Sequence, residues 1–334
     1  MKTAIILNAE SRSLQQQASE INTILKNLTA ALSSIELWLF YTGRQPESVP
    51  EMDCPLSVIK MIAVKNSYLP EYYLHLLEQL IIKNPMDLLL FPSDGQGGET
   101  ATRLAYRTGG SSSLQVEECG MASGRLEIAR PFYGNNLRAR FVLDHPPYCL
   151  SVARQPFQPV MMIPCDPRKM ETVKLDQPHC DWITGVVTIP DQPDTGLAYA
   201  DFVLVVGQGV KNKKTADVLQ DVAEKIGAEL GASRPVVMNA WIDMNRLIGA
   251  SGLIISPKIC IAAGVSGTGV FSVGIKNSEF IVAVNTDSNA PIFQIAHAGI
   301  VGDLQEILAE LEKLIIAEKT GKGSHALHES GIET

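Results

Sequence analysis

Apolar residues follow two patterns that alternate through the first hundred positions of the chain. Four short runs are almost continuously apolar, as expected of parallel strands covered on both faces, at 3–8, 37–41, 57–63 and 86–91. Between them, apolar residues recur at helical spacing, in one stripe over 14–28 and in a second over 72–80. The alternation predicts βαβ units and a Rossmann-like parallel sheet.

A β-rich stretch interrupts this alternation at 114–160. Short runs at 125–129, 139–143 and 149–153 follow one another without a helical pattern between them, which favours an antiparallel edge or flap on the parallel sheet. The Pro, Asp and Gly content of 190–196 is typical of a linker. We therefore predict an N-terminal α/β domain over residues 1–190 that contains the β-rich insertion.

After the linker the strand and helix patterns resume. The expected strands are 202–206, 259–263 and 280–284, and the expected helices are 215–230 and 304–317. Asp303 and Glu306 form a candidate capping box for the last helix. These patterns predict a C-terminal, doubly wound α/β domain over residues 191–320, followed by a disordered tail at 321–334.

Composition and charge favour a soluble protein whose partners are small molecules and other proteins. The 334 residues, 46% hydrophobic and 19% charged, are sufficient for two cores. A net charge of -8, without a cluster of lysine or arginine, argues against binding to nucleic acid or an anionic membrane. The amino-terminal apolar stretch is too short for a signal peptide or a membrane span, which predicts a cytoplasmic protein.

The cysteines do not have the spacing of a metal site. They are scattered, without a CxxC pair, at Cys54, Cys119, Cys149, Cys165, Cys180 and Cys260. His179 and Cys180 are neighbours, but adjacent side chains of an extended chain point apart. We therefore expect reduced thiols and no bound metal.

Turns made of small residues separate the apolar strands between positions 231 and 304. Such turns let backbone N–H groups approach a phosphate or a flat heterocycle. Five segments occur in an order and spacing that resemble the FAD-binding half of an electron transfer flavoprotein alpha subunit: 231–234, 248–252, 264–267, 281–285, and 290–294 followed by 299–301 and Asp303. The segment 132–136 resembles the first domain of the same family.

The resemblance implies that the C-terminal domain holds FAD in an extended pose. Ser233 and Arg234 stand where the family places a Ser-Arg pair near the isoalloxazine, and a guanidinium there favours its anionic reduced forms. Ser251 keeps the hydroxyl that the family directs at the flavin N5. The other implied contact residues are Gln208, Ile248, Gly249, Ala250, Ser266, Gly267, Thr268, Gly269, Val270, Phe271, Asn285, Asp303 and Leu304, of which the last three fall at the adenosine end.

The chain also departs from the family at the implied flavin contacts. Gln208 replaces an arginine, Ala250 replaces a glutamine, and Val270 and Phe271 replace a Gln-His pair, so that charged and hydrogen-bonding groups are lost. One interpretation is that FAD is retained at a different potential, since one charge-assisted hydrogen bond is worth about 1.5–3 kcal/mol. The other is a changed or lost nucleotide, which would leave a non-redox interaction subunit.

The function implied by the resemblance is electron transfer. An electron transfer flavoprotein alpha-like subunit uses FAD to shuttle electrons between a flavin dehydrogenase and an acceptor, and no side chain need act as an acid, base or nucleophile. The implied partners are a beta-type subunit, contacted through the N-terminal domain, and an acyl-CoA dehydrogenase-like flavoenzyme. A homodimer is the alternative if there is no beta subunit.

Several residues have simpler interpretations. Asp303 fits the N-cap of the last helix, and Arg234 fits a surface ion pair. The loop 92–100 follows a strand and opens a helix, but it lacks a GKS/T ending and is acidic, which favours a turn and cap over a phosphate loop. Ser266 nearly matches a hydrolase nucleophile elbow, but Thr268 replaces the final glycine and His297 precedes Asp303, against the usual order.

Overall fold

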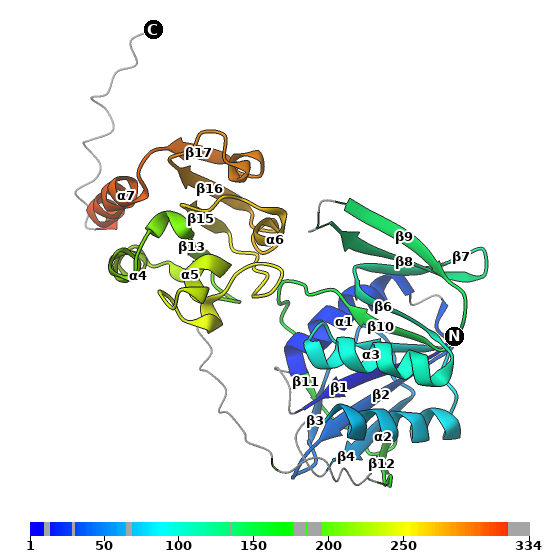
Figure 1. The fold of residues 1–334 in the computed structure, drawn as a ribbon. Helices are drawn as coiled ribbons and strands as arrows, with labels where there is room; N and C mark the ends of the chain where they lie inside the picture. The colour runs from blue at the N-terminus through cyan, green and yellow to red at the C-terminus, as the bar shows by residue number, and fades with distance from the viewer. Residues whose placement is uncertain are drawn as a thin grey trace. The chain divides into compact units, whose positions relative to one another are not determined.

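The computed structural model describes residues 1–9, 14–28, 31–64, 69–133, 135, 137–176, 185 and 196–319. Two compact units divide the chain, one within Met1–Ile189 and one within Pro190–Thr334, and we call them the N-terminal and C-terminal units (Figure 1). The expected linker at 190–195, the tail at 321–334, the His179-Cys180 pair, and Gly134 and Asn136 of the segment 132–136 lie outside the described residues.

A seven-stranded sheet forms the centre of the N-terminal unit. Its strand order is β12 (Met170–Val173), β4 (Val58–Ala63), β2 (Ser34–Tyr41), β1 (Lys2–Asn8), β5 (Leu88–Phe91), β10 (Tyr148–Val152) and β6 (Ser111–Val116), with every neighbouring pair parallel. Side chains alternate between two cores, since Ile5 and Leu7 enter one and Ala4 and Ile6 the other. Burial on both faces explains the continuous apolar runs of the sequence.

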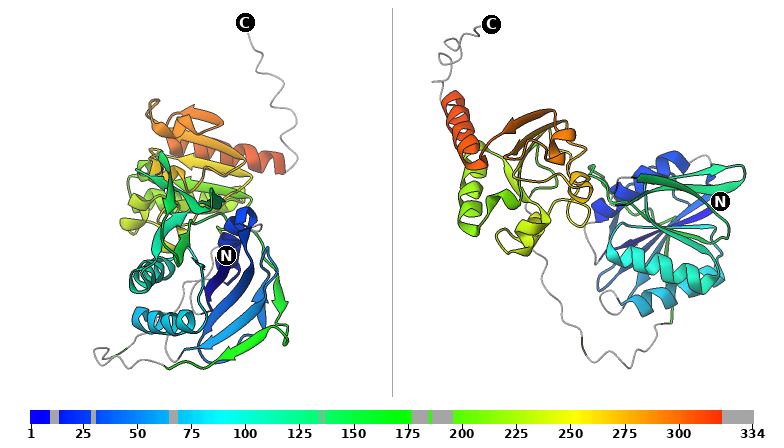
Figure 2. Two further views of the ribbon diagram at one scale, coloured as in Figure 1. Left: turned by 90° about the vertical axis from the view of Figure 1, so that its right-hand side faces the viewer. Right: turned by 45° about the horizontal axis from the view of Figure 1, so that its top comes forward.

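Helices cover both faces of this sheet. The helix α1 (Leu14–Leu28) packs on the face of Ile5 and Leu7, while α2 (Pro70–Lys83) and α3 (Gly95–Thr108) pack on the other. The left view of Figure 2 shows the two cyan helices together on one side of the blue strands. Before α3, Oδ1 of Asp94 accepts the backbone N–H of Gly97 at 2.6 Å, so that the loop 92–100 is a turn and cap, as predicted.

The β-rich stretch divides between two sheets. The strands β7 (Glu118–Ala122), β8 (Arg125–Phe132) and β9 (Leu137–Leu143) form a separate antiparallel sheet, which joins the α1-side core through residues such as Leu126 and Ile128. The prediction of a flap was wrong for β10, which lies inside the parallel sheet between β5 and β6. The three-stranded sheet stands where an ordinary crossover between β6 and β10 has a helix, and it covers the face on which α1 packs. A separate antiparallel ladder is formed by β3 (Ser48–Pro50) and β11 (Met162–Pro164).

The C-terminal unit contains a five-stranded parallel sheet. Its order is β14 (Glu229–Ala232), β13 (Phe202–Val206), β15 (Ile259–Ala263), β16 (Phe280–Asn285) and β17 (Ala298–Val301). Three helices, α4 (Lys213–Ile226), α5 (Arg234–Met238) and α7 (Leu304–Lys319), contribute to the core on one face, and α6 (Gly269–Ser272) contributes to the other. The unit is therefore doubly wound, as the sequence predicted.

The predicted helix over 215–230 is too long at its carboxyl end. The helix α4 ends at Ile226 because Gly227, at φ 82°, closes it, and residues 229–232 form β14, which was not expected. The helix buries Leu219, Val222 and Ile226 as expected, but Val218 is 49% exposed. The sequence pattern thus identified the buried face of the helix and missed its end.

Asp303 caps the last helix. Its Oδ1 accepts the backbone N–H of Gln305 at 2.8 Å, and no reciprocal bond from Glu306 is found among the described residues.

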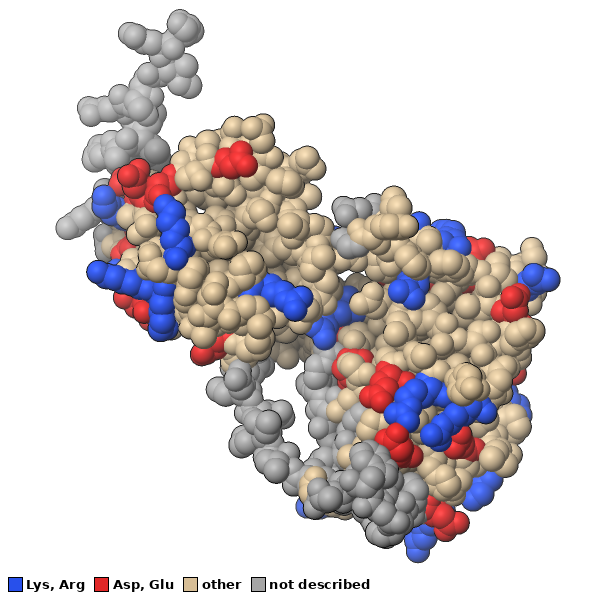
Figure 3. All heavy atoms as spheres, viewed as in Figure 1, with Lys and Arg blue, Asp and Glu red and all other residues tan. Residues whose placement is uncertain are grey.

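None of the described helices has both the length and the apolar character to cross a bilayer, and no group of three His, Cys, Asp or Glu side chains suited to a metal occurs in the same part of the chain. Figure 3 shows acidic and basic side chains mixed on the face in view.

Candidate functional site

A cavity of about 460 Å³ lies at the carboxyl edge of the C-terminal sheet. Residues at or after the end of each of the five strands line it: Ser233 for β14, Gln208 for β13, Ser266 for β15, Asn285 for β16 and Asp303 for β17. Because neighbouring strands lie about 4.8 Å apart, five strands make an edge about 19 Å long. The cavity therefore has the length for an elongated ligand.

Two glycine turns meet at the centre of this edge. Numbered in chain order, the strands lie in the order 2-1-3-4-5 across the sheet, so the chain adds strands on one side of β13 first and then on the other. Open α/β sheets bind their ligands at such a switch point, which here lies between β13 and β15. A Cβ at Gly207 would lie 2.2 Å from the carbonyl oxygen of Gly264, and Gly209 donates its N–H to that oxygen at 3.0 Å. Only glycine at position 207 permits this approach, which leaves the crevice lined by backbone.

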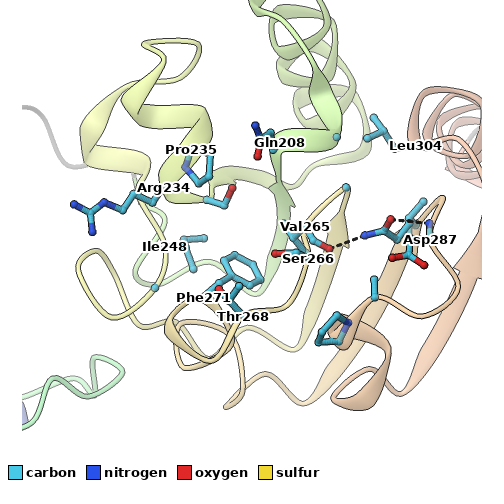
Figure 4. Close-up of a pocket in the computed structure, with 18 of the residues that line it drawn as sticks. Gln208, Arg234, Pro235, Ile248, Val265, Ser266, Thr268, Phe271, Asp287 and Leu304 are labelled. Carbon is cyan, nitrogen blue, oxygen red and sulfur yellow. Dashed lines mark hydrogen bonds between the residues drawn. The ribbon is translucent and has the colours of Figure 1, made fainter. Parts of the chain in front are cut away.

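The turn after β15 is fixed by hydrogen bonds to its neighbours. Nδ2 of Asn285 donates to the carbonyl of Val265 at 2.7 Å, and Oδ1 of Asn285 accepts the N–H of Asp287 at 3.0 Å. The carbonyl of Ser266 accepts the N–H of Ile292 at 3.1 Å. These bonds hold the turn so that the exposed side chains of Ser266 and Thr268 line the cavity (Figure 4).

One side of the cavity is apolar. Ile248 and Phe271 are 2% and 7% exposed and pack into the core beneath it, and Val270 and Pro235 line it as well. The N–H of Ala250 donates to the carbonyl of Val270 at 2.9 Å, which joins the turn 248–251 to α6. Figure 4 shows Pro235, Ile248 and Phe271 on one side of the site, with Asp287 and Leu304 on the other.

The charged residues lining the cavity are Arg234 and Lys211, which are basic, and Asp287 and Asp303, which are acidic. Arg234 is exposed, and in the described part of the chain it has no ion pair, so the surface ion-pair interpretation is not supported there. Figure 4 shows its guanidinium directed away from the other labelled residues. Lys211 was not predicted, because it lies outside the small-residue turns that identified the others.

Fourteen of the sixteen predicted contact residues line this one cavity; Gly267 and Gly269 do not. The residues that sequence reasoning missed are Gly209, Lys211, Pro235, Gly264, Val265, Val284, Thr286, Asp287, Ala290, Pro291 and Gly302. Most of them adjoin a predicted residue in the same turn, so extending each turn by a residue or two would have found them. Contact of any of these residues with FAD stays a prediction.

The hydrolase interpretation of Ser266 finds no support in the cavity. Nδ1 of His297 accepts the N–H of Ile281 at 2.9 Å, and its ring stacks on Phe280 with centroids 5.4 Å apart. No histidine is among the described residues that line the cavity, so Ser266 has no imidazole base there. Asp303 caps α7 and also lines the cavity, so that both of its predicted roles are compatible with the structure.

Two protein-family models match this chain, one in each unit. Residues 61–178 match the electron transfer flavoprotein domain, and residues 196–276 match the electron transfer flavoprotein FAD-binding domain. The chain is 35% identical over 237 residues to the putative electron transfer flavoprotein subunit YgcQ of Escherichia coli, covering 71% of this chain and 81% of that one.

Two further relatives come from other bacteria. Protein FixB of Bradyrhizobium diazoefficiens is 33% identical, covering 74% of this chain and 69% of that protein. The subunit LctC of lactate dehydrogenase (NAD(+),ferredoxin) from Acetobacterium woodii is also 33% identical, and the match covers 77% of this chain but only 62% of LctC. With both family domains and these relatives, the chain belongs to the electron transfer flavoprotein alpha subunit family.

Proposed function

We propose that the cavity of the C-terminal unit binds FAD and that the chain is the FAD-carrying subunit of an electron transfer pair. The observation that carries this proposal is the extent of the cavity, which runs past the ends of all five strands. An edge of about 19 Å suits an extended dinucleotide better than a mononucleotide. The match to the FAD-binding domain supports the same ligand.

The residues present fit an extended FAD. Gly207 packs against the backbone of Gly264 with no room for a Cβ between them. Gly209 and Gly264 therefore line the cavity close to its centre without a side chain. Ile248 and Phe271 offer an apolar wall to the ring system, while Ser251 and Ser266 offer hydroxyl groups. The bound flavin supplies the one- or two-electron chemistry, and the chain orients it and sets its electrostatic surroundings.

The residues that replace the family's flavin contacts do not close the cavity, which supports retention of the cofactor. Val270 and Phe271 line the cavity, but the Phe271 ring is buried in the core at 7% exposure and leaves the cavity open. Their side chains donate no hydrogen bonds, so the site offers less stabilisation to a negatively charged ring than one with the glutamine and histidine of the family. We therefore expect a lower flavin midpoint potential, not a lost cofactor.

Partners follow from the same proposal. We infer a beta-type subunit as the permanent partner, and an acyl-CoA dehydrogenase-like flavoenzyme as the electron donor, in the cytoplasm. The name of LctC describes it as a subunit of a lactate dehydrogenase, which makes 2-hydroxy-acid dehydrogenases a second donor class to test. A homodimer is the expected assembly where no beta-type subunit exists.

The test is to purify the chain with and without a co-expressed beta-type subunit and to record the visible spectrum. We expect flavin absorption at about one flavin per chain, and chromatography of the released cofactor should identify FAD and not FMN. A protein that stays colourless in both preparations after incubation with FAD would contradict the proposal and support the non-redox interaction subunit instead.

A further inference from the structure

Lys211 occupies a strained turn directly after the Gly207–Gly209 segment. Its φ is 68° and its ψ is -32°, and the N–H of Asn212 donates to the carbonyl of Val210 at 2.9 Å, which closes a γ-turn around Lys211. A γ-turn with positive central φ is rare and strained, the more so at a residue that carries a side chain. Backbone strain of this kind is concentrated at ligand-binding positions.

Ordered structure on both sides holds the strained residue in place. Before it, the N–H of Lys211 donates to the carbonyl of Gln208 at 3.0 Å, and Val210 is buried. After it, Oδ1 of Asn212 accepts the N–H of Thr215 at 3.0 Å and caps α4. The position of Lys211 at the cavity is therefore set by a short 3-10 turn (Gln208–Val210) and a capped helix.

The ammonium of Lys211 has no ion pair or hydrogen bond within the described residues, although Lys213, two positions later, pairs with Asp217 at 3.2 Å. Lys211 follows β13, the second of the five strands, beside the crevice where β13 and β15 meet. The other cation, Arg234, follows β14 on the apolar side, and Asp287 and Asp303 follow β16 and β17. Lys211 thus puts an uncompensated positive charge between the two ends of the cavity.

We propose that Lys211 binds the diphosphate of a dinucleotide in this cavity and supplies the positive charge that Gln208 does not. This inference rests on the proposed function and on the predicted contacts, which put the flavin near Ser233 after β14 and the adenosine near Asn285 and Asp303 after β16 and β17. The diphosphate joins these two halves and so falls at the central turns. A flexible ammonium is suited to it as a point charge with three donors. Lys211 would then select ligands that carry a diphosphate.

The test compares four ligands with the full chain and with Lys211→Gln, using calorimetry or quenching of fluorescence. FAD and ADP carry the diphosphate, whereas riboflavin and adenosine do not. We expect Lys211→Gln to weaken FAD and ADP binding by about 10- to 100-fold, as for the loss of one charge-assisted hydrogen bond, and to leave riboflavin and adenosine unchanged. The salt dependence of FAD binding should also become shallower.

Three variants separate charge from backbone effects. Lys214→Gln removes an exposed neighbouring charge that does not line the cavity, and its affinities should match the wild type. Lys211→Gly relieves the strained φ and removes the charge, so it should lose the same affinity as Lys211→Gln, whereas Lys211→Arg should retain most of it. Equal losses for all four ligands, or no loss for FAD and ADP, would overturn the role of Lys211.

The same measurements distinguish a failure of the proposed function from a failure of the role of Lys211. A wild-type chain that binds ADP but not FAD would refute the flavin proposal, while the comparison of ADP affinities would still decide the role of Lys211. A wild-type chain that binds none of the four ligands would overturn both.

Discussion

The two parallel sheets of this chain end in opposite ways at their carboxyl edges. In the N-terminal unit the space beside Asn8, Pro92 and Gln96 amounts to about 20 Å³, whereas in the C-terminal unit the corresponding edge opens into about 460 Å³. Both sheets are parallel and both are covered by helices. The difference must therefore come from the residues that follow the strands.

Long polar side chains fill the edge of the N-terminal unit. Gln17 and Glu20 of α1 are completely buried. Oε1 of Gln17 accepts the N–H of Asn8 at 3.0 Å, its Nε2 donates to the carbonyl of Asn8 at 2.8 Å, and Nδ2 of Asn8 donates to Oε1 of Gln96 at 3.0 Å. In addition, Asp94 already occupies the N–H of Gly97 that a phosphate would need.

Small residues leave the edge of the C-terminal unit open. The turns there contain Gly207, Gly209, Ser233, Gly264 and Ser266, whose side chains are too short to cross the crevice. A parallel sheet thus supplies a possible site at its carboxyl edge, and small residues after its strands decide whether that site is open.

The largest expected effect is a loss of stability from a substitution in the turn after β15, at the open edge. Gly267 has φ 80°, and a Cβ there would lie 2.2 Å from the backbone nitrogen of Ile292. Gly267→Ala should destabilise the C-terminal unit by about 3 kcal/mol or more, from the left-handed backbone and the clash together. Urea unfolding, followed by hydrogen exchange of peptides from each unit, measures this.

Gly43 provides the matched control in the N-terminal unit. Its φ is 64°, but nothing lies within 4 Å of its Cβ position. Gly43→Ala should therefore cost only the backbone term, about 1–2 kcal/mol. Equal effects at Gly43 and Gly267 would show that close packing of the turn after β15 contributes nothing.

Filling the open edge should abolish binding without unfolding the unit. Ser266 is exposed at the cavity, and Ser266→Trp places an indole in the space proposed for FAD. We expect FAD affinity to fall by at least about 100-fold, which corresponds to about 2.7 kcal/mol, with the melting temperature little changed. Ser288→Trp, at an exposed position that does not line the cavity, is the control, and equal FAD affinity in the two variants would place the ligand elsewhere.

Removing the polar contacts of the closed edge should destabilise the N-terminal unit. Gln17→Leu keeps the volume but removes both hydrogen bonds to the backbone of Asn8, and we expect a loss of about 2–3 kcal/mol in its unfolding free energy. Gln15→Leu, which removes one bond to Val160 from a partly exposed position, should lose less than about 1 kcal/mol. Binding of FAD or ADP by the Gln17→Leu unit would show that one side chain alone keeps this edge closed.

The sequence predicted most of the elements because their determinants are local. The runs 202–206 and 259–263 are observed as β13 and β15 with the same bounds, since each is a continuous apolar segment between turn residues. The strand β14 was missed because Leu230 continues the helical stripe of α4, and only the conformation of Gly227 separates the two. The place of β10 was missed because pairing with β5 and β6 is a long-range property.

The site was predictable to a similar extent, for a related reason. Turns rich in small residues mark Ser233, Ser266 and Asn285 in the sequence, and the fold brings them to one edge. The contribution of Lys211 depends on a γ-turn and on its having no ion pair within the described residues, and neither feature has a sequence pattern. The closed edge of the N-terminal unit could not be predicted from the sequence either. Gln17 has the pattern of an ordinary polar helix residue, and only its contact with the backbone of Asn8 shows that it fills this edge.

The smallest expected effect is a difference in alkaline stability between the units. Burial raises the pKa of Cys119 and Cys149 to about 12 in the N-terminal unit, and burial raises the pKa of Cys260 to about 12 in the C-terminal unit. Above pH 9 the unfolded thiol ionises while the folded thiol stays protonated, so stability falls as pH rises, by up to about 1.4 kcal/mol per pH unit for each thiol. Cys149→Ala should flatten the pH dependence of unfolding between pH 9 and 10.5 in the N-terminal unit only, and Cys260→Ala in the C-terminal unit only, when each is followed by hydrogen exchange. An unchanged slope in either variant would mean that its thiol ionises as readily in the folded chain as in the unfolded one.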